Sequence, residues 1–161
     1  MIAIDIDTRA IDQALSRLSQ QVSNMQPIMT EIGEEIASRV DLTFTDATDP
    51  YGNPWEALSA ITQARRTNGS NKPLNDTGRL KASITSNASS HDVEIGTNVK
   101  YAKTHQNGAS QGQYGKNKRN TPIPWGDIPA RPFLPTQARG LPSDWETDIL
   151  KIIQKHLERA V

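Results

Sequence analysis

The 161-residue chain contains no cysteine. This absence excludes disulfide frameworks, cysteine-ligated zinc or iron–sulfur sites, and thiol catalysis. Histidine is scarce as well, since only His91, His105 and His156 occur, and none has a second metal ligand at a suitable helical spacing. The sequence therefore predicts a protein without a metal ion or other cofactor.

Long apolar runs and aromatic residues are also in short supply. Phe, Trp and Tyr make up 5% of the chain, and the mean hydropathy is −0.62. No run approaches the roughly 20 apolar residues that cross a membrane, and the start of the chain lacks the basic and apolar regions of a signal peptide. We expect a soluble protein with no membrane partner, whose residues 1–161 form one domain with a modest core.

Neither sign of charge is in excess, because 18 Lys and Arg balance 18 Asp and Glu. Residues 1–60 nevertheless hold ten acidic against three basic residues, a net charge of −7, whereas residues 61–120 hold ten basic against three acidic residues, a net charge of +7. If the two blocks lie on different faces, copies attract head to tail and form rings or filaments. If the blocks intermingle in the fold, their charges cancel locally, and the sequence leaves both outcomes open.

Two apolar periods predict the structure of the N-terminal part. Residues 1–7 alternate Ile with other residues, which predicts a half-buried strand followed by an N-cap at Thr8. Spacings of three and four then predict one helical stripe, which consists of Ile11, Leu15, Leu18, Val22, Met25, Met29, Ile32, Ile36, Val40 and Phe44. Pro27 interrupts this stripe, because proline removes a helical hydrogen bond and restricts the residue before it. We expect two helices, or one kinked helix, with the break at residues 24–27.

Turn-forming residues dominate the next stretch. Residues 46–58 are rich in Asp, Asn, Gly and Pro, and we expect Trp55 and Leu58 to pin them to the core. Residues 61–75 form a polar, mobile connection. Residues 76–84 then predict a helical turn that is capped by Asp76 or Thr77 and anchored by Leu80.

A hairpin and a short helix are predicted next. The helical turn runs into a strand, and residues 88–97 pair with this strand as a hairpin, which turns at residues 89–92 and carries Val93 and Ile95 on one face. In the helix over residues 98–108, Tyr101 and His105 share a face, and Gly108 ends it.

The C-terminal part combines a long loop, a proline-rich segment and a helix. Residues 109–127 have no periodicity and predict a mobile loop, of the length that is usually functional or disordered. Prolines at 129, 132 and 135 make residues 128–135 an edge strand or strut, with Phe133 and Leu134 as tethers. A capping box from Ser143 to Glu146 opens the last helix. The sequence thus predicts an α+β fold with a small antiparallel sheet, an N-terminal helix pair, a C-terminal helix and long polar loops.

Catalytic motifs are nearly absent. Asp76, Thr77 and Gly78 form the tripeptide of paired aspartic proteases, but no apolar strand precedes it, and a helix cap explains the same residues. The sequence has no nucleophile elbow, no phosphate-binding loop and no dinucleotide-binding glycine motif. We therefore predict no catalytic residue and no enzyme, and keep a hydrolase built on Asp76 as a remote alternative.

Basic residues supply the candidate binding positions. Arg131 is locked between two prolines, and we expect it to meet an internal carboxylate or a neighbouring subunit. The other candidates for a partner or subunit interface are Lys116, Lys118, Arg119, Arg65 and Arg66. Together with Tyr114 or Trp125 these cations also fit non-specific binding to nucleic acid, and the competing interpretation is an ordinary solvated loop.

Four segments in order resemble the phage virion morphogenesis family, which includes the tail completion protein S class and the G protein of Mu-like phages. They are DPYGNPW at 49–55, DTGRLKASI at 76–84, VEIGTNVKYAKTHQNG at 93–108, and IPARPFL at 128–134. The family-like structural positions are Trp55, Asp76, Gly78, Leu80, Tyr101, His105, Gly108, Pro132 and Phe133. One departure is Asn107, where the family pattern has an aromatic residue before the glycine.

The resemblance implies a non-enzymatic protein that completes a tail or a head–tail neck late in virion assembly. It implies action as a ring, often sixfold, whose partners are copies of itself and tail-tube or neck proteins. It also places the protein in the cytoplasm of the host bacterium during assembly and then in the virion, where basic loops can face DNA in a channel.

Overall fold

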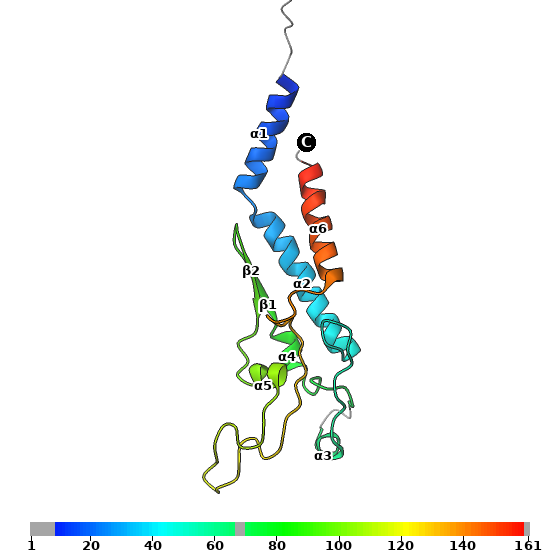
Figure 1. Cartoon of the computed structure of the whole chain (residues 1–161), viewed down its shortest axis with the longest axis vertical. Coiled ribbons are helices and arrows are strands. Elements are labelled where there is room, and N and C mark those ends of the chain that lie inside the picture. The colour runs from blue at the N-terminus through cyan, green and yellow to red at the C-terminus, as the bar shows by residue number, and fades with distance from the viewer. Residues whose placement is uncertain (1–8, 67–69, 160–161) are drawn as a thin grey trace, which may run out of the picture.

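The computed structural model describes residues 9–66 and 70–159. The strand predicted at residues 1–7 and the cap predicted at Thr8 lie outside these ranges. The described chain is elongated, with the first helix at one end and long loops at the other (Figure 1). None of the helices within the described ranges is long and apolar enough to cross a membrane.

The N-terminal stripe forms two helices, as predicted. Helix α1 spans Arg9–Ser23 and helix α2 spans Gln26–Asp46. The break falls at residues 24–25, and Pro27 lies in the first turn of α2, where its missing N–H costs no helical hydrogen bond. Helix α2 ends at Ala47, which adopts the left-handed conformation with φ 57°.

Helix α2 is the spine on which the other elements pack. The antiparallel strands β1 (Thr85–Ala88) and β2 (Val93–Gly96) lie on one side of it, and helix α6 (Ser143–Glu158) lies on the other (Figure 1). Gly33 allows the hairpin to approach closely, since a Cβ atom there would lie 2.2 Å from Ser86 Oγ. The predicted hairpin, its turn and the α+β class are confirmed.

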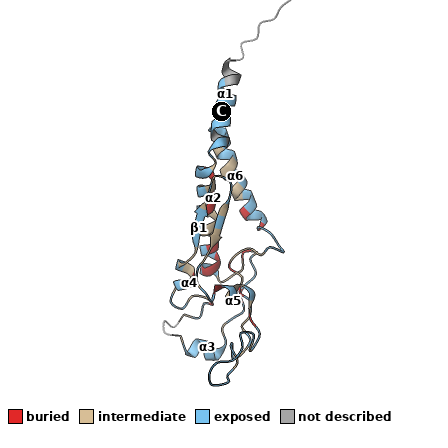
Figure 2. Ribbon diagram, turned by 90° about the vertical axis from the view of Figure 1, so that its left-hand side faces the viewer, coloured by how far each residue is buried: buried red, intermediate tan, exposed pale blue. Residues whose placement is uncertain are grey.

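The core lies around the C-terminal half of α2. Its buried residues are Val40, Phe44, Trp55, Leu80, Ala102, Phe133 and Trp145. The Phe44 ring packs edge-on against Trp55, with ring centres 5.6 Å apart, and against Phe133 at 5.3 Å. Figure 2 shows that burial is concentrated in the middle of the molecule, whereas α1 and the lower loops are largely exposed. The modest core and the anchoring role of Trp55 are therefore confirmed.

Three short helices frame the lower part of the molecule. Helix α3 (Ala60–Ala64) was not predicted, because its five residues include one large apolar side chain, Ile61, and so carry no apolar stripe. Its start is fixed by Ser59, whose hydroxyl accepts a hydrogen bond from Thr62 N. Helices α4 (Arg79–Ala82) and α5 (Ala102–Asn107) match the predicted short helical segments.

Two predicted helix caps are wrong. The residue at the N-cap of α4 is Gly78, which has φ 73° and no side chain, rather than Asp76 or Thr77. The N-cap of α6 is Pro142, so Ser143 is already helical and cannot form the predicted capping box with Glu146. Helix α4 thus starts one or two residues later than predicted, and helix α6 starts one residue earlier.

Candidate functional site

Five of the family-like residues line a cleft of about 780 Å³ below the core; they are Asp76, Gly78, Leu80, Tyr101 and His105. Four segments line it: residues 56–62, 74–80, 101–105 and 124–131. Apolar side chains are exposed on its walls, notably Ile61 and Trp125. The cleft therefore combines an apolar lining with the Arg131 and His105 side chains.

The proline-rich segment is a strut that α5 holds by hydrogen bonds. Gln106 Oε1 accepts from the backbone nitrogens of Phe133 (3.0 Å) and Leu134 (3.1 Å), and its Nε2 donates to the Leu134 carbonyl at 2.7 Å. Arg131 N donates to the His105 carbonyl at 2.7 Å. The predicted strut and the tether at Phe133, which is fully buried, are confirmed. Sequence reasoning missed Gln106, although its place beside His105 in the motif was a usable signal.

Gly108 lets the end of α5 and the strut come together. It has φ 74°, and a Cβ atom there would lie 2.8 Å from the Ile128 carbonyl oxygen and 2.9 Å from Ala130 N. Trp55 fixes the other side of the strut by donating from Nε1 to the Pro132 carbonyl at 2.8 Å. Trp55, Gly108, Pro132 and Phe133 thus share one structural task.

Arg131 is buried, with 6% of its surface exposed. Its Nε donates to the Glu56 carbonyl at 2.8 Å and its Nη2 to the Ala57 carbonyl at 3.1 Å. Burial lowers the pKa of this guanidinium, although an arginine keeps its charge in proteins. Its hydrogen-bond partners are main-chain carbonyls of the same chain rather than the carboxylate that the sequence suggested, and a role between subunits stays a prediction.

His105 lies beside Arg131 in the cleft. Its Nδ1 is buried and has no hydrogen-bond partner among the described residues, and its ring packs edge-on against Tyr101 at 5.7 Å. Burial, and secondly the charge of Arg131, lower the pKa of His105 below its usual value of 6.5. His105 is therefore neutral at pH 7.

The predicted basic residues do not form one patch. Arg66 is tied down inside its loop, because its Nη1 donates to the carbonyls of Ser70, Lys72 and Asn75 at 3.0, 2.8 and 2.9 Å. Arg65 lies over the ring of Trp125, with 5.9 Å between the guanidinium carbon and the ring centre. Only Lys116, Lys118 and Arg119 are grouped and exposed.

These three cations occupy the tip of residues 109–127, which we call the finger. The finger is folded like a hairpin, with backbone hydrogen bonds from Tyr114 N to Ile123 O and from Ile123 N to Gly115 O, both at 2.8 Å. Asn117 Oδ1 shapes the tip by accepting from the backbone nitrogens of Arg119 and Thr121. Figure 1 shows the finger projecting from the lower end of the molecule. The predicted loop thus has a hairpin-like backbone and presents positive charge at its tip, and its mobility stays a prediction.

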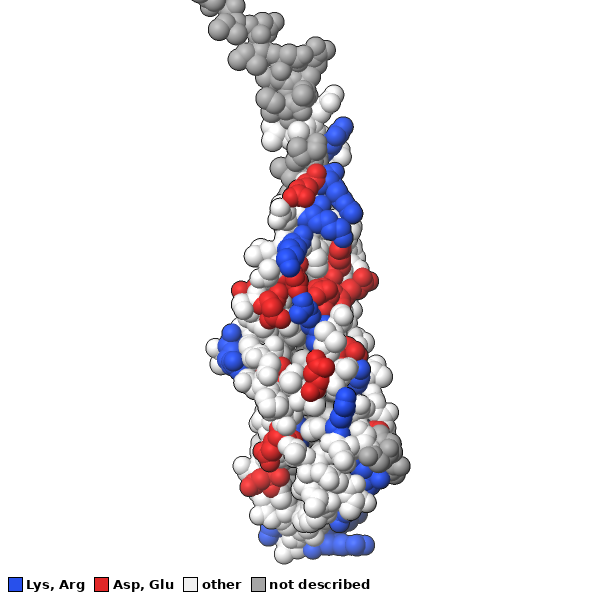
Figure 3. Space-filling model, turned by 90° about the vertical axis from the view of Figure 1, so that its right-hand side faces the viewer, with Lys and Arg blue, Asp and Glu red and all other residues white. Residues whose placement is uncertain are grey.

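Acidic side chains gather on α2 and α6. Arg39 forms ion pairs with three carboxylates, those of Glu35, Asp144 and Asp148, and Lys151 also contacts Asp148. Figure 3, which views the side that carries α6, shows acidic side chains over the middle of the molecule with basic ones among them, a further acidic group toward the lower end, and basic side chains near the top and at the lower tip. Acidic and basic side chains therefore intermingle over the middle, whereas the lower tip is basic.

Nearer the C-terminus, α6 is clipped to α2 by Glu31. Its carboxylate contacts Lys155 Nζ at 2.7 Å and His156 Nε2 at 2.6 Å. Hydrogen bonds from Lys155 and then from His156 lower the pKa of Glu31. The clip lies at the edge of a notch of about 380 Å³ between α1, the start of α2 and the end of α6.

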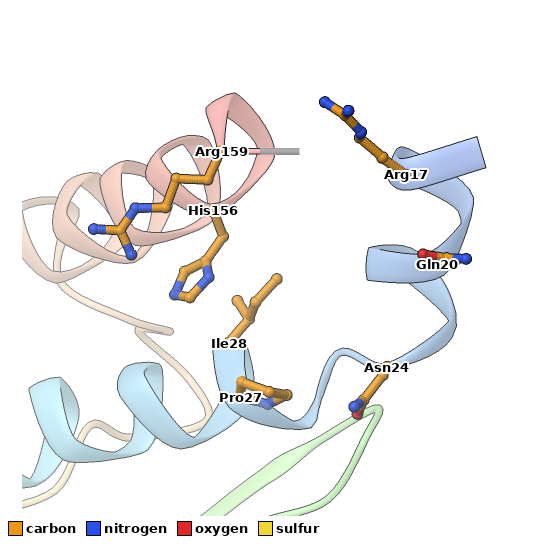
Figure 4. A pocket seen from close by; sticks show the side chains of 7 residues that line it. All are labelled: Arg17, Gln20, Asn24, Pro27, Ile28, His156 and Arg159. Carbon is orange, nitrogen blue, oxygen red and sulfur yellow. The ribbon is translucent and has the colours of Figure 1, made fainter. Parts of the chain in front are cut away.

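Polar and basic side chains of α1 face this notch. Figure 4 shows Arg17, Gln20 and Asn24 on one wall, opposite His156 and Arg159 of the C-terminal helix region. By helical geometry Leu15 lies on the side of α1 away from these residues, and 58% of its surface is exposed. The apolar stripe thus has a different environment on α1 than on α2.

The described residues include no group of three or more His, Asp or Glu that could hold a metal ion. Asp76, the acid of the protease-like tripeptide, lies exposed at the cleft in the turn before α4. The Thr77 hydroxyl accepts from Arg79 N at 3.4 Å, so this tripeptide shapes the start of a helix.

Comparison with known proteins gives two matches. The phage virion morphogenesis family matches residues 6–158. The "Mu-like prophage FluMu G protein 2" of Haemophilus influenzae is 36% identical over 160 residues, which cover 98% of this chain and 97% of that protein. No solved structure matches the chain.

Proposed function

This chain belongs to the phage virion morphogenesis family, and we propose that it is a structural subunit that completes a phage or prophage tail or head–tail neck. The near full-length similarity to a Mu-like prophage G protein carries this proposal, because no large domain has been gained or lost between the two chains. In this role the protein acts without catalysis, as a ring at the end of the tail tube.

The shape of the subunit supports a role in assembly. One core in the middle holds the molecule together, while α1 and the finger extend from opposite ends (Figure 1). Leu15 on α1 and Tyr114, Ile123 and Trp125 on the finger side are exposed apolar side chains. Such surface on a small subunit is typical of contacts with neighbours.

Negative-stain electron microscopy of the protein mixed with purified tail tubes tests this function. We expect ring-shaped density at one end of the tube, and a closed oligomer of the free protein by native mass spectrometry. A protein that stays strictly monomeric and leaves tube ends bare would contradict the proposal.

A second candidate function is non-specific contact with DNA, and the exposed cations at the tip of the finger favour it. Binding through these residues would weaken steeply with salt, because each phosphate contact releases counterions. It would need no base recognition, as suits a protein at a channel.

A pair of charge-matched variants tests this second function. Lys116→Gln with Lys118→Gln removes two finger charges, and Lys100→Gln with Lys103→Gln removes two exposed charges next to and on α5. DNA contact by the finger predicts that only the first pair lowers affinity and the salt slope in a fluorescence anisotropy titration. Equal losses in both pairs, or no binding at low salt, would reject it.

A further inference from the structure

The tip of the finger carries positive charge with no counter-charge nearby. Within the described part of the chain, the side chains of Lys116, Lys118 and Arg119 have no ion pair or hydrogen bond. Residues 109–126 include no Asp or Glu. Three unpaired cations at the tip of a hairpin-like projection therefore favour contact with a negatively charged partner surface.

A groove of about 470 Å³ on the same chain has the opposite charge. It runs between the C-terminal half of α2, the turn at residues 48–52 and the start of α6, and we call it the acidic groove. Asp46 and Asp144 lie along it, together with Leu42, which is 48% exposed. The groove thus offers carboxylates to an ammonium or guanidinium group and an apolar surface to the stem of a lysine.

The charges around the acidic groove do not balance within the chain. Arg39 and Lys151 face three carboxylates, those of Glu35, Asp144 and Asp148. Asp46 adds a further negative charge and has no ion pair with a described residue. Asp49 is already engaged, because it accepts from Tyr51 N and Asn53 N and contacts Arg139 at 3.7 Å. Asp46 is therefore the groove carboxylate without an ion pair, and Asp144 shares the single Arg39 with Glu35 and Asp148.

The finger does not fill the acidic groove of its own chain. It projects from the lower end of the molecule, away from the end of α2 (Figure 1), and no ion pair between described residues joins the two. Within the basic segment of residues 61–120, Lys72 contacts Thr45 and Lys81 contacts Asp41 near the end of α2. Among the described residues, the finger cations therefore leave the acidic groove of their own chain open.

We propose that the finger of one copy docks in the acidic groove of the next copy. This inference rests on the proposed ring and names the contact that builds it. Lys116, Lys118 and Arg119 would face Asp46 and Asp144 of the neighbour, so the charge on each surface is neutralised by a second copy. The contact joins two different surfaces, and such head-to-tail contacts close into rings when the rotation between copies permits.

A second copy fits the acidic groove and the finger better than nucleic acid fits the finger. The chain has no net charge, and two further cations of the cleft, Arg66 and Arg131, are held by main-chain carbonyls, which leaves Arg79 as an exposed cation of its lining. A phosphate backbone would therefore meet few cations besides the tip, whereas the acidic groove provides a surface of complementary charge for it.

Disulfide trapping tests the contact, since the chain has no cysteine of its own. One chain carries Thr121→Cys beside the tip, where all three cations stay in place, and a second chain of different tag length carries Leu42→Cys in the acidic groove. Under mild oxidation we expect a mixed dimer of intermediate mass. Its yield should fall at least about tenfold when Lys116, Lys118 and Arg119 are changed to Gln.

A matched control uses Asn87→Cys on β1, which is equally exposed but remote from the finger and the acidic groove. The proposal would be overturned if Thr121→Cys formed the mixed dimer as well with Asn87→Cys as with Leu42→Cys. It would also be overturned if the yield of the mixed dimer stayed the same when the finger charges were removed. Oligomers without the mixed disulfide would reject this contact and leave the ring intact. Absence of any oligomer would reject both the contact and the proposed ring.

Charge reversal gives a second test that does not depend on cysteine geometry. Lys118→Asp and Asp46→Lys should each weaken self-association about tenfold, because each places like charges across the contact. The double variant should recover most of the loss in analytical ultracentrifugation. Both sites are exposed, so folding is preserved, and a double variant no better than the single ones would contradict the pairing.

Discussion

Two groups of cations in the lower part of the molecule lie in opposite surroundings. Arg131 and Arg66 are held by carbonyl oxygens of the backbone. Arg131 binds carbonyls of residues 56 and 57, which are far from it in the sequence, and Arg66 binds three carbonyls within residues 70–75 of its own loop. Lys116, Lys118 and Arg119 project into solvent on the finger. Basic residues of one region are thus bound inside the fold in one place and left exposed to a partner in another.

Replacement of Arg131 should cause the largest loss on the folding side of this comparison. Arg131→Ala removes two charge-assisted hydrogen bonds and leaves the carbonyls of Glu56 and Ala57 without these donors, so we expect a loss of about 2–4 kcal/mol in the free energy of unfolding. Urea denaturation measures it. A variant as stable as the parent would show that Arg131 does not stabilise the fold and belongs with the exposed finger cations.

Arg66→Ala should have a smaller, more local effect. The side chain is half-buried, and its loss frees three carbonyls that water can partly reach, which suggests a cost of about 1–2 kcal/mol. Hydrogen exchange should rise over residues 70–75, and the core around Phe44 should keep its protection. Uniform deprotection of the whole chain would place Arg66 in the global fold instead.

The neighbourhood of Arg131 also predicts a pH dependence. Because burial and Arg131 lower the pKa of His105, the folded state resists its protonation, whereas the unfolded state protonates it below about pH 6.5. The contribution of His105 to stability is therefore full above pH 6.5 and declines as pH falls toward the lower pKa of the folded state. In His105→Gln, the denaturation midpoint should depend less on pH in this window than it does in the parent chain. An unchanged pH dependence would contradict the role of His105.

The smallest effect on stability should come from the finger. Changing Lys116, Lys118 and Arg119 together to Gln should alter the free energy of unfolding by no more than about 0.5 kcal/mol, because exposed side chains without partners contribute little. The same variant should lose self-association at moderate salt. A large loss of stability would reveal that the finger cations act within the fold.

Much of the architecture could be predicted from the sequence. Helical spacing and Pro27 gave the two N-terminal helices and their break, and alternation with turn residues gave the hairpin. Prolines at fixed intervals predicted the strut. These features depend on local backbone preferences and apolar periods, which the sequence states directly.

The surroundings of the cations could not be predicted in the same way. Arg131 and Arg66 bind main-chain carbonyls, and since every residue has one, no side-chain signal reveals which carbonyls a fold brings near. The sequence did not reveal helix α3 or the caps at Gly78 and Pro142 for a related reason, because these features depend on backbone geometry rather than on polar side chains. The exposed Leu15 on α1 shows the same limit, since the spacing of the apolar residues predicts a helix but not what covers it.

Native mass spectrometry most directly tests whether the finger cations act in self-association while Arg131 and Arg66 act in the fold. It compares the parent chain with the variant in which Lys116, Lys118 and Arg119 are Gln. We expect a closed oligomer for the parent and a folded monomer, with a narrow range of low charge states, for the variant. The same oligomer in both samples, or a monomer in both, would contradict this expectation.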